Sequence, residues 1–235
     1  MEFCTSAEIL DFCLKNNIEC SEEKAKLFDR MSDMLEEFNS HTNVTALKTK
    51  KDICFKHFID SLGVLKYDII KKGAKTVDIG CGAGFPGVPL AIACPEARVT
   101  LLDSLGKRMK WLEEILPQLD VRAQCVTARA EEAAAERRES YDYAVSRAVA
   151  RLNILLELTA PYVKVGGAVL AMKGSAAREE LAECTSAIKK LGLQLESVKE
   201  FSIDGASHAV IVLRKTAPTP KQSPRRYAKI KQSPL

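Results

Sequence analysis

The chain has 235 residues, of which 46% are hydrophobic and 28% are charged, and its formal net charge is +4. This length and composition suit a single α/β domain of ordinary core size with a small extension. They exclude a membrane-spanning protein, because the longest apolar run is too short to cross a bilayer, and no basic segment followed by an apolar stretch indicates a secretory signal.

Residues 1–72 are predicted to be a helical extension, because apolar residues recur at helical spacing along this stretch. Thr5-Ser-Ala-Glu8 has the pattern of a capping box at the start of the first helix. Ser21 can cap a second helix. A third helix is expected over about residues 51–65, and the polar stretch before it, residues 38–46, suits a loop.

From residue 75 onward, expected strands and helices alternate, which predicts a mostly parallel sheet with helices on both faces. Strands are expected at residues 75–79, 98–103, 121–126, 142–146, 166–172, 193–201 and 207–214. Helices are expected at about residues 87–94, 106–116, 130–138, 151–163 and 176–191. The last two strands are joined by a turn-rich link, so they can pair as a terminal antiparallel hairpin.

Four glycines follow the first expected strand of this region, at Gly80, Gly82, Gly84 and Gly87. Glycines let the backbone approach a ligand where a Cβ would collide, and the next helix points its free N–H groups back at the loop. Gly82-x-Gly84-x-x-Gly87 fits the dinucleotide fingerprint. Asp78-x-Gly80-x-Gly82-x-Gly84 instead resembles the first motif of S-adenosylmethionine (SAM) methyltransferases. Both patterns predict a nucleotide-type ligand.

The next expected strand ends in an acid, Asp103, about 20 residues after these glycines. A carboxylate at this spacing can accept hydrogen bonds from ribose hydroxyls. NAD and SAM both carry such a ribose, so Asp103 does not separate the two ligands. A seven-strand order with a terminal antiparallel hairpin resembles the SAM-methyltransferase sheet more than a six-strand parallel dinucleotide fold.

The end of the chain is basic and holds no acid after Asp204. From residue 214 onward, the basic residues are Arg214, Lys215, Lys221, Arg225, Arg226, Lys229 and Lys231. Such a segment favours a polyanion, most simply nucleic acid, as partner. Residues 216–235 contain several prolines and no hydrophobic pattern, so we expect an extended, mobile tail; a disordered solubilising end is the alternative.

Eight cysteines are spread along the chain, and none forms a C-x-x-C pair or stands at metal-ligand spacing from one of the three histidines. We therefore expect reduced thiols in a cytoplasmic protein without a metal site. Cys81 lies inside the glycine loop, but no histidine is near it in sequence, so a nucleophilic role is disfavoured. From spacing alone, His57 on the third helix is more typical of a packing or surface residue.

Several stretches together, in order along the chain, resemble one family. They are Asn39-x-x-x-Asn43-Val-Thr-Ala46, His57-Phe-Ile-Asp60-Ser61, Asp78 to Leu90, Leu101 to Arg108, Ala128-Arg-Ala-Glu-Glu132, Ser146-Arg-Ala148, Lys173-Gly174 and Pro224-Arg-Arg226. These segments are similar to those of bacterial methyltransferases of the RsmG (GidB) type, which modify guanine N7 in small-subunit (16S) ribosomal RNA. The segment from Asp103 to Arg108, next to the glycine loop, is the most specific part.

The resemblance implies a Rossmann-like SAM-methyltransferase fold, with a seven-strand, mostly parallel sheet, an antiparallel C-terminal strand and flanking helices. It implies a helical extension at residues 1–72, a SAM-binding domain at residues 73–215 and a basic tail at residues 216–235. The partner would be small-subunit ribosomal RNA or the subunit particle, and a cytoplasmic monomer is expected.

The resemblance also assigns roles to residues. The cofactor side would comprise Asp78, Gly80, Cys81, Gly82, Gly84, Phe85, Asp103, Ser104, Ala130, Glu131 and Arg147. The catalytic residues facing the RNA side of the pocket would be Asn43, His57, Arg129 and Arg147. Contacts to the RNA would come from Lys107, Arg108, Lys173, Arg225 and Arg226. No metal is implied.

Three other functions compete with this interpretation. An NAD-dependent oxidoreductase would use the dinucleotide fingerprint and Asp103. A non-catalytic RNA-binding factor for ribosome assembly would keep the fold, but it would not need the intact glycine loop. A methyltransferase with another acceptor, such as transfer RNA or a protein, would share the cofactor site.

Overall fold

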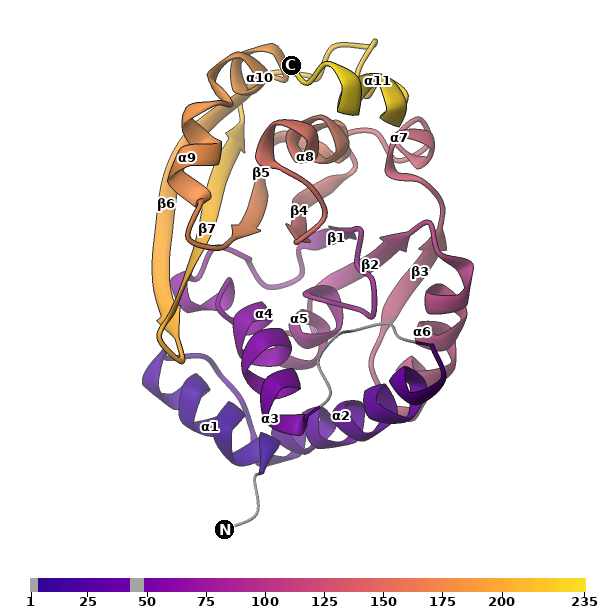
Figure 1. Ribbon diagram of the computed structural model, residues 1–235, viewed down its shortest axis with the longest axis vertical. Coiled ribbons are helices and arrows are strands. Elements are labelled where there is room, and N and C mark those ends of the chain that lie inside the picture. The colour runs from indigo at the N-terminus through magenta and orange to yellow at the C-terminus, as the bar shows by residue number, and fades with distance from the viewer. Residues whose placement is uncertain (1–3, 43–48) are drawn as a thin grey trace.

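The computed structural model describes residues 4–42 and 49–235. At its centre lies a seven-stranded sheet in the order β3-β2-β1-β4-β5-β7-β6 (Figure 1). The strands are β1 (Lys75–Ile79), β2 (Arg98–Asp103), β3 (Ala123–Thr127), β4 (Tyr141–Arg147), β5 (Val163–Lys173), β6 (Leu193–Ile203) and β7 (Ala206–Lys215). Strands β1 to β5 pair in parallel, and β7 is antiparallel to both β5 and β6. The expected methyltransferase-type sheet is confirmed.

Helices cover both faces of the sheet, and each face has its own buried apolar cluster. The helices of this region are α5 (Gly87–Ala93), α6 (Gly106–Gln118), α7 (Ala130–Ala133), α8 (Leu152–Thr159), α9 (Ala177–Ala182), α10 (Thr185–Lys190) and α11 (Tyr227–Gln232). Neighbouring strand residues alternate between the clusters: Leu101 belongs to one and Leu102 to the other. Because both faces are covered, β1 and β2 are buried along nearly their whole length.

The expected helix at residues 130–138 is wrong in its length, because α7 ends at Ala133. Beyond it, Glu139 has a left-handed φ of 48° and donates its backbone N–H to the Pro161 carbonyl. These contacts with distant residues override the helical preference of the alanine-rich sequence. The expected helix at residues 151–163 is likewise shorter, because β5 begins at Val163, and the one at residues 176–191 divides into α9 and α10.

The N-terminal extension begins with α1 (Thr5–Lys15) and α2 (Glu22–Thr42). The capping-box prediction is wrong: Cys4 is the N-cap, its side chain makes no capping hydrogen bond, and Thr5 lies in the helix and is buried. The Ser21 cap is present, because Ser21 Oγ accepts a hydrogen bond from the Lys24 backbone N–H at 3.3 Å.

The third expected helix contains three kinds of turn. It runs through α3 (Lys50–Ile53), a π-helix (Cys54–Ile59) and α4 (Asp60–Leu62), and a 3-10 turn (Leu65–Tyr67) follows. A π-helical turn is rare and is often found at functional sites. This one carries His57.

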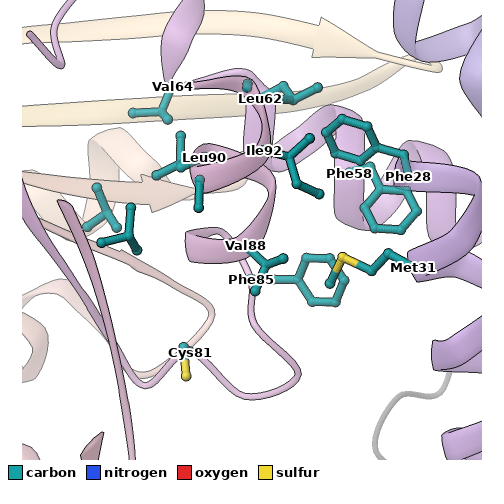
Figure 2. Packing of buried hydrophobic residues seen from close by; sticks show 14 of the residues in the cluster. Phe28, Met31, Phe58, Leu62, Val64, Cys81, Phe85, Val88, Leu90 and Ile92 are labelled. Atoms are coloured by element: carbon teal, nitrogen blue, oxygen red, sulfur yellow. The ribbon is translucent and has the colours of Figure 1, made fainter. Parts of the chain in front are cut away.

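The extension and the sheet share one core. Phe28 of α2 packs edge-on against Phe58 of the π-helix at 5.3 Å between ring centroids, and Phe58 lies 5.7 Å from Phe85 of the glycine loop. Figure 2 shows these rings in the same cluster as Val88 and Ile92 of α5. The helical extension therefore supports the loop directly.

The prediction of an extended tail is wrong. Residues 216–235 fold back on the domain and include α11, which lies beside α8 and α7 (Figure 1). Ile230 of α11 is fully buried. This docking could not be predicted from the local sequence pattern, because it depends on side chains that are far away in the chain.

Candidate active site

The glycine loop after β1 adopts backbone angles that only glycine adopts without strain. The φ angles are +73° at Gly80 and +58° at Gly82. A Cβ on Gly80 would lie 2.5 Å from Val149 Cγ2, whereas a Cβ on Gly82 would meet nothing closer than Arg108 Nη1 at 3.9 Å. Gly80 is therefore required for a close approach of two loops, and Gly82 exposes its backbone to open space.

Asp103, at the carboxyl end of β2, is oriented by two backbone donors. Its Oδ2 accepts a hydrogen bond from the Gly82 N–H at 3.0 Å, and its Oδ1 accepts one from the Leu105 N–H at 2.9 Å. Each carboxylate oxygen can accept a second bond. The carboxylate is thus fixed next to the loop with lone pairs to spare for hydroxyl groups of a ligand.

Asp78 lies beneath the loop and is fully buried. Its Oδ2 accepts a hydrogen bond from the Gly87 N–H at 2.7 Å, which ties the end of β1 to the start of α5. Its Oδ1 has no hydrogen-bond partner among the described residues. Burial raises the pKa of this carboxyl group to about 7, against the opposing effect of the Gly87 hydrogen bond. Asp78 therefore shapes the loop from below, and the lining of the cavity above it does not include this residue.

A cavity of about 380 Å³ opens above the loop at the carboxyl edge of the sheet. It brings together most residues predicted for the cofactor, namely Gly80, Gly82, Asp103, Ser104, Ala130 and Glu131, and also Arg108 and Arg129. We call it the cofactor cavity. Leu158 of α8 and Tyr227 of the tail also line this cavity, and neither was predicted from the sequence. No motif marks either one, because each reaches the cavity only through tertiary packing.

A second cavity, of about 330 Å³, adjoins the first. Its lining includes Arg147 and Lys173, which were predicted to act at the site, together with Asp60, Glu180 and His208. We call it the basic cavity. Ala148 and Val149 line both cavities. Arg147 was predicted to bind the cofactor as well, but it lines only the basic cavity.

Arg147 is held in place by three acceptors. Its Nη1 donates to Asp60 Oδ2 at 2.7 Å and to the Lys56 carbonyl at 2.6 Å, and its Nη2 donates to His57 Nδ1 at 2.8 Å. The guanidinium also lies over Phe85, with Cζ 5.3 Å from the ring centroid. Only 12% of the Arg147 side chain is exposed. The structure brings Arg147 into contact with His57, which was predicted to face the same side of the pocket; no motif in the sequence indicates this hydrogen bond.

Burial and the neighbouring Arg147 lower the pKa of His57 to about 4. The imidazole is therefore neutral at physiological pH, with Nδ1 as an acceptor. Its ring stacks on Phe85 at 4.4 Å between centroids. His57 thus connects the π-helix to the glycine loop.

Asp60 joins Arg147 to a histidine from the far end of the chain. Its Oδ1 lies 2.8 Å from His208 Nδ1, on β7. Burial alone would raise the pKa of Asp60, but the contacts with His208 and Arg147 outweigh burial and hold this pKa below its ordinary value. His208 could not be predicted as a site residue, because a lone histidine on a strand carries no sequence motif.

The remaining predicted residues lie elsewhere. Cys81 is buried with its Sγ 3.8 Å from Met109 Sδ, and burial raises the pKa of its thiol, so it is not an activated nucleophile. Gly84 and Phe85 pack beneath the loop against apolar side chains. Arg225 is paired with the buried Glu157, whereas Lys107 and Arg226 are exposed. Asn43 lies outside the described residues.

Residues 24–210 match the profile of a protein family described as rRNA small subunit methyltransferase G, or GidB. The chain belongs to this family. A relative from Alkaliphilus oremlandii named ribosomal RNA small subunit methyltransferase G is 41% identical, covering 93% of this chain and 94% of the relative. A relative of the same name from Desulfitobacterium hafniense is 42% identical and covers 93% and 92%, respectively.

Solved structures of other proteins share the fold of this chain. TYW2 from M. jannaschii, crystallised in complex with AdoMet, superposes with a TM-score of 0.53 at 16% identity, over 63% of this chain and 71% of that one. TrmN from Thermus thermophilus gives a TM-score of 0.52 at 18% identity, over 67% and 48%. The protein is a SAM-dependent methyltransferase, which corrects the oxidoreductase alternative.

The residues of the cofactor cavity fit SAM, the cofactor of the GidB family. The exposed backbone at Gly82 admits a ligand, Asp103 offers oriented acceptors for ribose hydroxyls, and apolar atoms of Leu102, Ala128 and Leu158 suit a purine. Among the described residues, no cluster of His, Cys, Asp and Glu is placed to hold a metal ion, and no helix is long and apolar enough to cross a membrane.

Proposed function

We propose that the protein methylates N7 of a guanine in small-subunit ribosomal RNA, with SAM as methyl donor. The observation that carries this proposal is the junction of the cofactor cavity and the basic cavity at Ala148 and Val149. An acceptor bound in the basic cavity would lie directly beside a cofactor bound in the other. The name of the family and of its relatives supports an RNA acceptor.

Methyl transfer to guanine N7 makes few chemical demands on the site. Guanine N7 carries a lone pair and no proton, so no general base is required; N7 must instead be held in line with the methyl group at near-attack distance. When bound, SAM supplies an electrophilic methyl group on a positively charged sulfur. The environment of His57 suits a reaction without a general base. Its Nδ1 accepts a hydrogen bond from Arg147, so His57 serves as a packing and positioning residue.

The charge of Arg147 matters because the purine becomes cationic as the methyl group arrives. An unpaired cation nearby would repel that charge. Asp60, at 2.7 Å, neutralises Arg147 and reduces the repulsion. A paired contact of one arginine with O6 and N7 would block the methyl acceptor. Arg147 already donates hydrogen bonds to three acceptors within the protein. We therefore infer that it orients the wall of the basic cavity and does not hydrogen-bond to N7.

The basic residues divide into two groups. Lys173 pairs with Glu180 at 2.8 Å and Arg225 pairs with Glu157 at 2.6 Å, so these two cations serve mainly in the fold. Lys107 and Arg226 are exposed and Arg108 borders the cofactor cavity, so these three are our candidates for RNA phosphates.

The test is methyl transfer from labelled SAM to unmodified small-subunit RNA and to subunit particles, followed by mapping of 7-methylguanine through chemical cleavage. A single modified guanine is the expected result. Label on another atom or in another class of RNA would overturn the assignment of N7 or of the acceptor. Tight SAM binding without transfer to either form would point to a different acceptor.

We further propose that the protein works as a cytoplasmic monomer. Its substrate is made in the cytoplasm, and one chain supplies residues to both cavities. Sedimentation equilibrium at micromolar concentration should give the mass of one chain, and a stable dimer would contradict the proposal.

A further inference from the structure

The C-terminal tail is fixed to the domain by partly buried polar contacts at two places. At the first, Arg138 donates to three tail carbonyls: Nη1 to Ser223 at 2.8 Å, and Nη2 to Pro220 at 2.9 Å and to Thr219 at 2.5 Å. Thr219 also donates its backbone N–H to Glu139 Oε1 at 2.7 Å. Residues 219–223 therefore follow a fixed course over the domain.

The second attachment is an ion pair between Arg225 and Glu157 of α8. The Glu157 side chain has no exposed surface, and it accepts bonds from the Arg225 backbone N–H at 3.0 Å, from Nε at 2.8 Å and from Nη2 at 2.6 Å. A buried carboxylate left without its partner is costly. Further along the tail, Ile230 is fully buried, and Leu235 packs on an apolar cluster of the sheet. Undocking the tail would therefore expose apolar surface and leave a buried charge unpaired.

These attachments set the position of Tyr227, the first residue of α11. Tyr227 lines the cofactor cavity together with Leu158 of α8 and with Ala130 and Glu131 at the start of α7. Among the described lining residues it is the one aromatic side chain. Tyr227 itself is only half-buried, so its ring has surface left to cover a ligand.

We propose that the tail is a structural part of the cofactor site and that Tyr227 contacts the nucleoside half of bound SAM. The cavity that Tyr227 lines also has apolar side chains in its lining, among them Leu102, Ala128 and Leu158, and Asp103, the ribose acceptor, lines it as well. An aromatic ring on such a wall suits the π-face of a purine. One basic residue of the tail thus serves the cofactor site through the fold: Arg225, paired with Glu157, holds the cofactor wall in place.

The test measures binding of S-adenosylhomocysteine to the full chain by calorimetry, without RNA. Tyr227→Ala should weaken binding roughly tenfold, the size of effect that removal of one base–aromatic contact produces. Tyr227→Phe keeps the ring and should bind within about twofold of the wild type. Gln232→Ala, an exposed position on the same helix, is the matched control and should leave binding unchanged.

A second ligand identifies the half of the cofactor that Tyr227 touches. 5′-Methylthioadenosine lacks the amino-acid part, so Tyr227→Ala should weaken it by the same factor as S-adenosylhomocysteine. Weakening of S-adenosylhomocysteine alone would overturn the assignment to the nucleoside. Equal affinities of Tyr227→Ala and the wild type for both ligands would overturn the contact itself.

Hydrogen–deuterium exchange of the wild-type protein tests the proposal without any substitution. S-adenosylhomocysteine should slow exchange in α11 as well as in the glycine loop. Protection of the loop alone would show that the tail lies outside the cofactor site. Because neither experiment involves RNA, failure of the N7 assignment would leave these results unaffected, and the reverse also holds.

Discussion

Asp60 is the residue on which the wall of the basic cavity depends, because one carboxylate serves both Arg147 and His208. Asp60→Asn keeps the shape but removes the charge, so Arg147 is left largely buried without a counter-ion. We expect the free energy of unfolding to fall by about 3 kcal/mol, and kcat to fall with little change in the Kd of SAM. Urea denaturation and single-turnover methylation measure the two effects.

The matched control for this change is Asp68→Asn. Asp68 also faces a cation, Lys71 at 2.9 Å, but 89% of its side chain is exposed. An exposed pair contributes at most about 1 kcal/mol, and Asp68 lines neither the basic cavity nor the cofactor cavity. Equal decreases of stability in the two variants would mean that burial of Asp60 has no particular importance.

His57 makes the stability of the protein depend on pH. Its pKa is about 4 in the folded state, below the ordinary 6.5, so the unfolded chain binds the extra proton in this range. The stabilisation is therefore complete above about pH 6.5 and is lost as the pH falls towards 4, by about 3 kcal/mol in total. Replacing His57 by Gln should remove this dependence in urea denaturation curves recorded between pH 4 and 7.

Asp78 acts in the opposite direction over the same range. Its folded pKa of about 7 lies above the ordinary 3.8, so the folded state binds the extra proton and stability declines as the pH rises from about 4 to 7. The difference between the wild-type and His57→Gln curves therefore isolates His57. A difference that does not vary with pH would contradict the low pKa of His57.

Among the elements, strands could be predicted well and special turns could not. The central strands are buried on both faces, so each is a short apolar run whatever its neighbours. The π-helix carrying His57 has the sequence pattern of an ordinary helix, because nothing local distinguishes its wider turn. The glycine loop and Asp103 follow from local motifs, whereas His208 and Tyr227 reach the site through sheet pairing and tail docking.

The docking of the tail on α8 can be measured through its buried ion pair. Arg225→Ala leaves Glu157 buried without a partner, so we expect the free energy of unfolding to fall by about 3 kcal/mol. Adding Glu157→Gln removes the unpaired charge and should restore part of this stability. Thermal unfolding of the two variants gives the comparison; a double variant less stable than the single one would mean that the charge is not the source of the effect.

For the whole molecule, the exposed basic residues of the tail should govern the salt dependence of RNA binding. Lys221, Arg226, Lys229 and Lys231 are exposed, whereas Lys215 and Arg225 are engaged with Glu139 and Glu157. Replacing the four exposed residues by Gln should flatten the plot of log Kd against log salt. Removing one phosphate interaction reduces the slope by about 0.7 for single-stranded RNA and about 0.9 for a duplex.

The control is a second set of four, in which Lys66, Lys71, Lys72 and Lys75 are replaced by Gln. These residues are also exposed, but they precede or begin β1, at the edge of the sheet opposite the cavities. Both variants have the same net charge, so long-range attraction falls equally in both. Only direct interactions with RNA can separate their slopes. Equal slopes would mean that the tail attracts RNA through net charge alone, and its remaining role would be to complete the cofactor site.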